Sequence, residues 1–160
     1  MGLLTTTVIV SSILAFCSGS FSCPGIWQTS LGSSCYKFLG GNLTWAEASL
    51  HCREIGGHLA IITSAEENKY LKDFAVRHHV SYPLYRYWLD GKDDESENHW
   101  YWDWTGEPIK YTPWQPGEPS NSGQVEHCLG LYGNGNWNDF KCDFKNHAIC
   151  ELEYVDANLL

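Results

Sequence analysis

The residues with the clearest chemical potential lie late in the chain, and all of them carry oxygen atoms. They are Glu118, Ser120, Glu126, Asn138 and Asp139. Ca²⁺ prefers six to eight oxygen ligands from carboxylates, amides and carbonyls, and an acidic cluster of this kind would repel itself without a cation. Composition alone favours the plainer interpretation of a solvated acidic loop, so a calcium site needs further support from the spacing of these residues.

The sequence contains little that indicates an enzyme. Glu118 and Glu126 could form a glycosidase pair, but such a pair needs one protonated carboxyl group, and two metal-bound carboxylates would leave no general acid. The chain has no nucleophile elbow, HExxH motif or phosphate loop. A zinc site is not expected either, because there is no CxxC pair and the histidines show no ligand spacing beyond His78-His79. The sequence therefore predicts a binding protein and no enzyme.

The charge balance restricts the class of partner. The 160 residues include 19 acidic and 10 basic side chains, which gives a net charge of -9. Without a basic patch, nucleic acid and anionic membranes are poor partners, whereas an acidic surface attracts cations. One domain is expected at this length.

The first 22 residues are typical of a secretory signal peptide. They contain no charged side chain, and the apolar run TVIVSSILAF (7–16) is followed by small residues at 17–20. The alternative, an uncleaved anchor, would need about 20 apolar residues, and this run is shorter and rich in Ser and Thr. We therefore expect a signal peptide over 1–22, a single extracellular domain over 23–153 and a short acidic tail over 154–160.

Removal of this segment would leave an even number of cysteines: Cys23, Cys35, Cys52, Cys128, Cys142 and Cys150. In a secreted chain an even count predicts a disulfide framework. Six cysteines allow 15 pairings, so the count by itself leaves the pairing open.

The first half of the domain reads as helices and short strands. A strand is expected over 35–38 and is broken by Gly40-Gly41-Asn42. Thr44-Trp45-Ala46-Glu47 has the form of a capping box, and the helix that follows ends at Gly56-Gly57. A strand is predicted over 59–62, and a second capping box over 64–67 opens another helix.

The second half has short strands separated by stretches rich in Gly, Pro, Asn and Asp. The strands are expected over 87–89, 100–104, 128–132 and 148–152. The loop over 105–125 is long for a compact domain, which is typical of a functional loop. The sequon Asn42-Leu43-Thr44 is a possible glycosylation site at Asn42.

These patterns together resemble the C-type lectin-like domain, and the resemblance covers residue 23 to about residue 153. The motifs that carry it are CYKF (35–38), WAEA (45–48), Cys52, HLAII (58–62), EEN (66–68), YWLDG (87–91), Trp114, PGEP (116–119), Cys128, WND (137–139), Cys142 and AICE (148–151). YWLDG departs modestly from the family's usual Trp-Ile-Gly-Leu.

The resemblance implies a fold, a disulfide pairing and a backbone feature. The implied fold is α+β, with two helices packed on short, mostly antiparallel sheets and a long calcium-binding loop. The implied pairs are Cys23–Cys35, Cys52–Cys150 and Cys128–Cys142. The resemblance also implies a cis peptide bond between Glu118 and Pro119.

The family's sugar-binding members supply the spacing that composition lacked. They have a Glu-Pro-Asn triplet, a second Glu eight residues after the first, and an Asn-Asp pair twelve residues later. Glu118, Glu126 and Asn138-Asp139 reproduce both intervals. The resemblance implies that two vicinal sugar hydroxyls complete the Ca²⁺ shell, with Glu118 and Glu126 as acceptors and Asn138 as donor.

Two departures from the family pattern affect specificity and metal content. Ser120 stands where mannose-type sites have Asn, and its hydroxyl is shorter and can donate or accept. Glu118 favours mannose-like sugars slightly over galactose. At the auxiliary calcium site of some members, Asp93 and Glu97 match, but Asn121 and His127 replace acidic residues, so a second Ca²⁺ is not expected.

The expected function is therefore that of a secreted, Ca²⁺-dependent lectin that recognises hexose hydroxyls on glycans, including those of microbes. The alternative is a lectin-like module that binds protein without sugar. Single sugar sites bind weakly, so useful binding requires several sites at once, and a homo-oligomer is one way to provide them.

Overall fold

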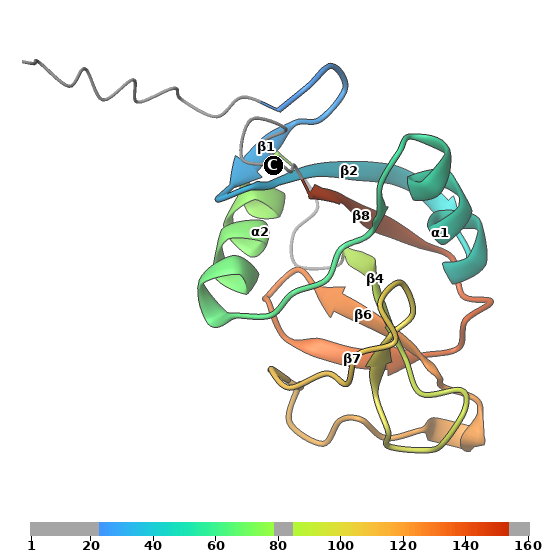
Figure 1. Cartoon of the computed structure of the whole chain (residues 1–160). Helices are drawn as coiled ribbons and strands as arrows, with labels where there is room; N and C mark the ends of the chain where they lie inside the picture. Colours follow the sequence, from blue (N-terminus) through green and yellow to red (C-terminus); the bar gives the residue numbers. More distant parts are fainter. Residues whose placement is uncertain (1–22, 79–84, 154–160) are drawn as a thin grey trace, which may run out of the picture.

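A computed structural model describes residues 23–78 and 85–153 and has the expected α+β architecture of two helices and a mixed sheet (Figure 1). The expected signal peptide and acidic tail lie outside the described residues. In chain order the elements are β1 (Thr29–Leu31), β2 (Ser34–Leu43), α1 (Trp45–Glu54), β3 (His58–Leu59), α2 (Ala65–His78), β4 (Arg86–Lys92), β5 (Tyr101–Trp102), the 3₁₀ helix η1 (Ser122–Gln124), β6 (Cys128–Tyr132), β7 (Trp137–Phe140) and β8 (Asn146–Glu153).

The strands form one sheet with the order β1-β2-β8-β4-β6-β7. The last strand, β8, lies between β2 and β4, where it is antiparallel to β2 and parallel to β4. β3 pairs with β8, and β5 pairs with β4. The long loop between β5 and β6 lies at one end of the molecule, away from α1 and α2 (Figure 1).

Several strands differ from the sequence-based expectation. The strands expected over 87–89, 128–132 and 148–152 are present. The strand expected over 59–62 shares only Leu59 with β3, and the one expected over 100–104 is shortened to β5. The glycines at 40 and 41 do not end β2. They lie within a register shift between Leu39 and Leu43, after which pairing with β8 resumes, because a bulge lets a strand accommodate a local irregularity. Strands β1 and β7 were not expected.

The capping box predicted at the start of α1 is confirmed in full. At the start of α2, only one of the two hydrogen bonds of a capping box is present. At α1 the Thr44 hydroxyl accepts from the Glu47 N–H (3.2 Å), and the Glu47 carboxylate accepts from the Thr44 N–H (2.7 Å). At α2 the Ser64 hydroxyl accepts from the Glu67 N–H (3.2 Å), but the buried Glu67 carboxylate accepts from the Thr63 N–H (2.9 Å) and the Tyr36 hydroxyl (2.6 Å). A tertiary partner therefore replaces half of the local motif.

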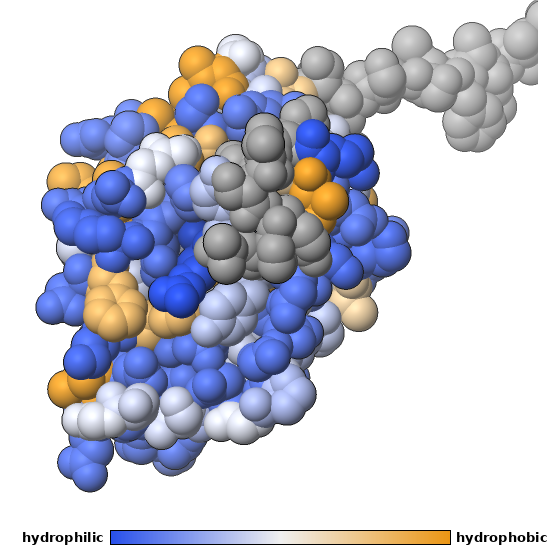
Figure 2. Space-filling model, turned by 180° about the vertical axis from the view of Figure 1, so that it is seen from behind, coloured by the Kyte–Doolittle hydropathy of each residue, from blue (hydrophilic) through white to orange (hydrophobic). Residues whose placement is uncertain are grey.

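Large aromatic side chains fill the core. Trp88 and Trp137 are fully buried, and the Trp88 and Trp45 indoles donate to the carbonyls of Leu43 and Leu89 (both 2.8 Å). Within residues 23–78 and 85–153, the large apolar side chains that are exposed are Ile26, Leu50, Val76, Trp104, Val125 and Phe144. On the face opposite to that of Figure 1, apolar residues are scattered among hydrophilic ones (Figure 2). Within the described ranges, no helix has both the length and the apolar character needed to cross a bilayer.

The three disulfides have the pairing that the resemblance implied. Cys23–Cys35, Cys52–Cys150 and Cys128–Cys142 join Cα atoms 5.7, 5.4 and 5.2 Å apart, within the usual range for disulfides. The second bond ties α1 to β8 across 98 residues, and the third closes the β6–β7 hairpin.

A buried carboxyl group in β4 makes the stability of the fold depend on pH. Asp90 is 1% exposed, and its Oδ2 accepts from the backbone N–H of Trp104 (2.7 Å). Burial raises the pKa of Asp90 to about 7, against the opposing effect of the Trp104 N–H. Because this pKa lies above the unfolded value of about 3.9, the folded state binds more protons between the two values, and stability falls as pH rises through that window.

Asp90→Asn is expected to reduce this pH dependence, because the amide keeps an acceptor for the Trp104 N–H and does not titrate. Between about pH 5 and pH 7 the slope of unfolding free energy against pH should change by up to about 1.4 kcal/mol per pH unit. Urea unfolding of the variant and the wild type across this range measures the slope. Asp143→Asn, at an exposed carboxylate, is the control, and parallel pH curves for Asp90→Asn and wild type would contradict the prediction.

Candidate metal centre

The residues expected to bind calcium come from two segments that the fold places side by side, the loop after β5 and strand β7. Strand β7 is fixed on both sides. It pairs with β6, and the buried Trp137 at its start donates from Nε1 to Oδ1 of Asn68 on α2 (2.9 Å). Asn138 and Asp139 follow directly and are also buried, at 6% and 0% exposed, so their positions are set by the core.

The long loop is attached to the edge of the same strand. The N–H of Trp137 donates to the Pro113 carbonyl (2.9 Å), and the Gln115 N–H donates back to the Trp137 carbonyl (2.8 Å). Three residues later the Glu118–Pro119 bond is cis, as the resemblance implied. The loop therefore turns at Glu118 beside the strand that carries Asn138 and Asp139.

The Asp139 carboxylate accepts hydrogen bonds from two backbone N–H groups of the loop. Its Oδ1 accepts from the Ser120 N–H (3.1 Å), and its Oδ2 accepts from the Asn121 N–H (2.6 Å). The Asn121 side chain in turn accepts from the Glu126 N–H (3.1 Å). Sequence reasoning missed this linking role of Asn121, because no local pattern indicates a contact with Asp139, 18 residues away.

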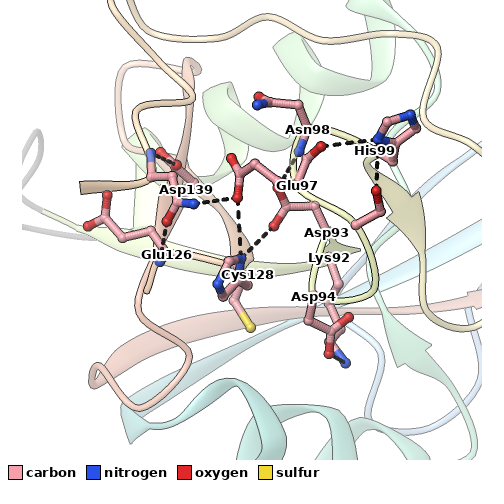
Figure 3. A network of polar contacts seen from close by, with 12 residues as sticks. Lys92, Asp93, Asp94, Glu97, Asn98, His99, Glu126, Cys128 and Asp139 are labelled. Carbon is pink, nitrogen blue, oxygen red and sulfur yellow. Dashed lines mark hydrogen bonds and ion pairs between the residues drawn. The ribbon is translucent and has the colours of Figure 1, made fainter. Parts of the chain in front are cut away.

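Glu126 faces the same turn from the other side. Its Oε2 accepts from the Ser122 N–H (2.8 Å) and lies 3.4 Å from the Ser120 hydroxyl. The structure thus brings all five sequence-predicted residues into one cluster, and Figure 3 shows Glu126 and Asp139 on adjacent segments of it. Their role as ligands stays a prediction.

Two oxygen atoms in this cluster are buried and have no hydrogen-bond partner: Oε2 of Glu118 and Oδ1 of Asn138. Burial, together with the adjacent Asp139 carboxylate, raises the pKa of Glu118, whereas the Ser120 hydroxyl and N–H act in the opposite direction. Buried acceptors without donors are costly, and an ionised carboxylate beside a second one is more so.

In the part of the chain that the structure describes, no side-chain cation pairs with these carboxylates. The ion pairs found among the described residues involve other carboxylates, and none includes Glu118, Glu126 or Asp139. Three carboxylates, an amide oxygen and a hydroxyl form a set of hard oxygen donors, which is what Ca²⁺ requires. The residues present therefore fit a calcium ion.

At the position of the auxiliary calcium site, nitrogen atoms contact the carboxylates. The Asn121 amide donates to Oε2 of Glu97, and Nδ1 of His127 lies 3.0 Å from Oδ1 of Asp93. Two nitrogen atoms thus face the two carboxylates where an all-oxygen site would need acceptors. This arrangement does not fit a second Ca²⁺, whose absence stays a prediction.

A cavity of about 670 Å³ lies next to the cluster and has Pro119 in its wall. Aromatic rings form much of the lining, with Trp100 and Trp114 5.1 Å apart between centroids. None of the five predicted ligands lines it, so this cavity is separate from the cluster.

Comparison with known proteins identifies the family. The model of the "Lectin C-type domain" matches residues 41–152. Perlucin of Haliotis laevigata is 38% identical over 125 residues, which cover 76% of this chain and 78% of the relative. The galactose-specific lectin nattectin of Thalassophryne nattereri is 33% identical over 130 residues, covering 81% of this chain and 79% of the relative.

A solved structure of similar fold comes from the same family as these relatives. The carbohydrate-recognition domain of the mouse scavenger receptor C-type lectin superposes with a TM-score of 0.73 at 34% identity, covering 84% of this chain and all of that domain. The chain described here belongs to the C-type lectin family, and its fold is that of a carbohydrate-recognition domain.

Proposed function

We propose that the protein is a secreted lectin that binds glycans through one Ca²⁺ held by Glu118, Ser120, Glu126, Asn138 and Asp139. The observation that carries this proposal is the pair of buried, unpartnered acceptors, Oε2 of Glu118 and Oδ1 of Asn138. A bound Ca²⁺ supplies the missing positive charge and open coordination positions for two vicinal hydroxyls of a hexose.

The proposed ligand side chains also form hydrogen bonds with the sugar. Glu118 and Glu126 accept hydrogen bonds from the two sugar hydroxyls, and Asn138 donates from Nδ2 to a hydroxyl oxygen. The bonds to the two ionised carboxylates are about twice as strong as neutral ones. Asp139 makes little sugar contact, because it is fully buried and its carboxylate already holds the Ser120 and Asn121 N–H groups.

The proposed sugar class is mannose-like, with galactose close behind. A Glu at position 118 supports the mannose type, whereas Ser120 removes the amide that would strengthen that preference. The relative nattectin is described as galactose-specific, which supports testing both sugars.

Retention on immobilised mannose and galactose, with and without Ca²⁺, tests the proposal. We expect retention in Ca²⁺ and elution by a chelator. A thermal unfolding scan should show stabilisation by Ca²⁺, because an ion that binds only the folded state raises its stability. No retention on either sugar, together with no thermal shift, would contradict the proposal. No retention with a Ca²⁺-dependent shift would instead favour the protein-binding alternative.

Ser120→Asn is expected to increase affinity for mannose. The side chain of the exposed Ser120 offers only a short hydroxyl, 3.4 Å from Oε2 of Glu126, whereas an amide side chain adds both an oxygen ligand and an N–H donor. One added hydrogen bond of about 1–1.4 kcal/mol corresponds to a gain of roughly five- to tenfold. Calorimetric titration with methyl mannoside measures it. Ser122→Asn is the matched control, since Ser122 contacts Glu126 through its backbone N–H, and equal gains in both variants would contradict a specific role for position 120.

Useful glycan binding by this domain requires several copies acting together, because a single shallow site binds a monosaccharide weakly. We propose a homo-oligomer or clustered display as the functional form. Light scattering of the purified protein measures the number of chains.

A further inference from the structure

A second cluster of metal-binding side chains lies beside the proposed calcium centre and includes a nitrogen donor. Asp93 follows β4, Glu97 lies in the next turn, and His127 precedes β6. Figure 3 shows Asp93 and Glu97 facing the segment between Glu126 and Cys128. Nδ1 of His127 lies 3.0 Å from Oδ1 of Asp93 and 3.9 Å from Oε2 of Glu97. One ligand atom from each residue lies within 4.8 Å of the other two.

The charge of this cluster calls for a cation. Asp93 is only 2% exposed, and a buried carboxylate is stable only with a compensating partner. The adjacent Lys92 does not provide it, because its ammonium pairs with Asp94 (2.5 Å) and Asp103 (3.6 Å). Among the ion pairs of the described residues, only His127 meets Asp93 and Glu97, and an imidazole carries a positive charge only when both of its nitrogen atoms are protonated.

The donor set and its spacing select the metal. Zn²⁺ takes His nitrogen and carboxylate oxygen at about 2.0–2.2 Å, so tetrahedral ligand atoms lie roughly 3.3 Å apart. The separations of 3.0 and 3.9 Å bracket this value. Ca²⁺ would instead need six to eight oxygens, and imidazole suits zinc better than calcium.

Both carboxylates are already oriented by neighbouring groups. Oδ2 of Asp93 accepts from the Asn98 N–H (2.9 Å), which leaves Oδ1 directed toward His127. Glu97 accepts from the Asn121 amide, and the backbone N–H of Asp93 donates to the His127 carbonyl (3.3 Å). Second partners of this kind hold metal ligands in place and strengthen binding.

We propose that Asp93, Glu97 and His127 form a Zn²⁺ site that is separate from the calcium centre. His127 binds through Nδ1 and carries its proton on Nε2, and water fills the fourth position. The site links the turn at 93–97 to the segment that begins with Glu126, so zinc fastens two loops that meet at the calcium centre. This proposal does not depend on sugar binding.

Titration of Zn²⁺ into the full chain in the presence of excess Ca²⁺ tests the site by calorimetry. We expect one saturable site per chain. His127→Ala should weaken it by more than about 100-fold, since even the loss of a second partner costs 10- to 100-fold. His99→Ala is the matched control, because His99 lies in the same turn but contacts Ser96 and the Glu97 carbonyl, and it should bind Zn²⁺ as the wild type does.

Two further variants keep the test decisive. Glu97→Gln changes a partly exposed side chain and should also weaken Zn²⁺ binding, whereas His127→Asp should lose Zn²⁺ selectivity over Ca²⁺. Circular dichroism verifies that each variant is folded. The absence of a saturable Zn²⁺ site in the wild type, or unchanged binding in folded His127→Ala, would overturn the proposal and leave only the direct contact between His127 and Asp93.

Discussion

Asn138→Asp is expected to abolish sugar retention while Ca²⁺ binding persists. Asn138 supplies the only side-chain amide on β7 at the centre, and its Oδ1 is buried without a partner. Aspartate keeps an oxygen for the metal but replaces the Nδ2 donor with a further acceptor. The hydroxyl oxygen that accepts from Asn138 would then face a carboxylate. Loss of this hydrogen bond, together with the repulsion between the hydroxyl oxygen and the new carboxylate, should cost about 3 kcal/mol or more, a factor above about 100.

Two measurements separate this effect from a general loss of structure. Retention on the sugar column reports the glycan site, and calorimetric titration of Ca²⁺ reports the metal. Asn134→Asp is the matched control, because Asn134 is exposed on the turn before β7 and is not one of the proposed ligands. Aspartate keeps the acceptor for the Asn136 N–H and loses only the 3.3 Å donation from the Asn134 amide to Gln115 Oε1. Full sugar retention by Asn138→Asp would place the glycan site elsewhere.

Removal of the Cys52–Cys150 bond is expected to cause the largest loss of stability among single disulfide deletions. In the chain-entropy model, a bond that closes 98 residues stabilises the fold by about 4.7 kcal/mol, and one that closes 12 residues by about 2.8 kcal/mol. Cys52 and Cys150 are also fully buried between α1 and β8, so replacing both with Ala adds a packing cost.

Urea unfolding of Cys52→Ala/Cys150→Ala and of the matched double variant Cys23→Ala/Cys35→Ala measures the difference. The first pair should lose at least about 2 kcal/mol more than the second. An equal loss in both variants would show that the length of the closed loop does not govern the stabilisation in this protein.

Local patterns in the sequence correctly predicted elements that depend on neighbouring residues. The capping box of Thr44 and Glu47 joins groups three residues apart, so its geometry is set within one helical turn. The same reasoning failed in part at α2, because Glu67 bonds to Tyr36, 31 residues away. Strand β7 was not predicted, because all four of its residues are buried. A fully buried strand lacks the alternation of apolar and polar residues that indicates a half-exposed strand.

The five proposed calcium ligands could be named as a set from the resemblance to a known family, whose spacing Glu118, Glu126 and Asn138-Asp139 match. The disulfide pairing was predictable on the same ground. Residue types alone left both open. The resemblance placed Asp93, Glu97 and His127 at the auxiliary calcium position, but only the structure shows that Nδ1 of His127 lies 3.0 Å from Asp93 and 3.9 Å from Glu97.

The amino-acid sequence by itself determined the family, the oxygen-rich residue set and the helix starts, because these depend on residue identity and on contacts within a few positions. Only the tertiary structure decided which acceptors lack donors and which carboxylates face a nitrogen. Those properties arise when β7 and two loops pack together, since burial removes water as a hydrogen-bonding partner and leaves each polar group to neighbours distant in the chain.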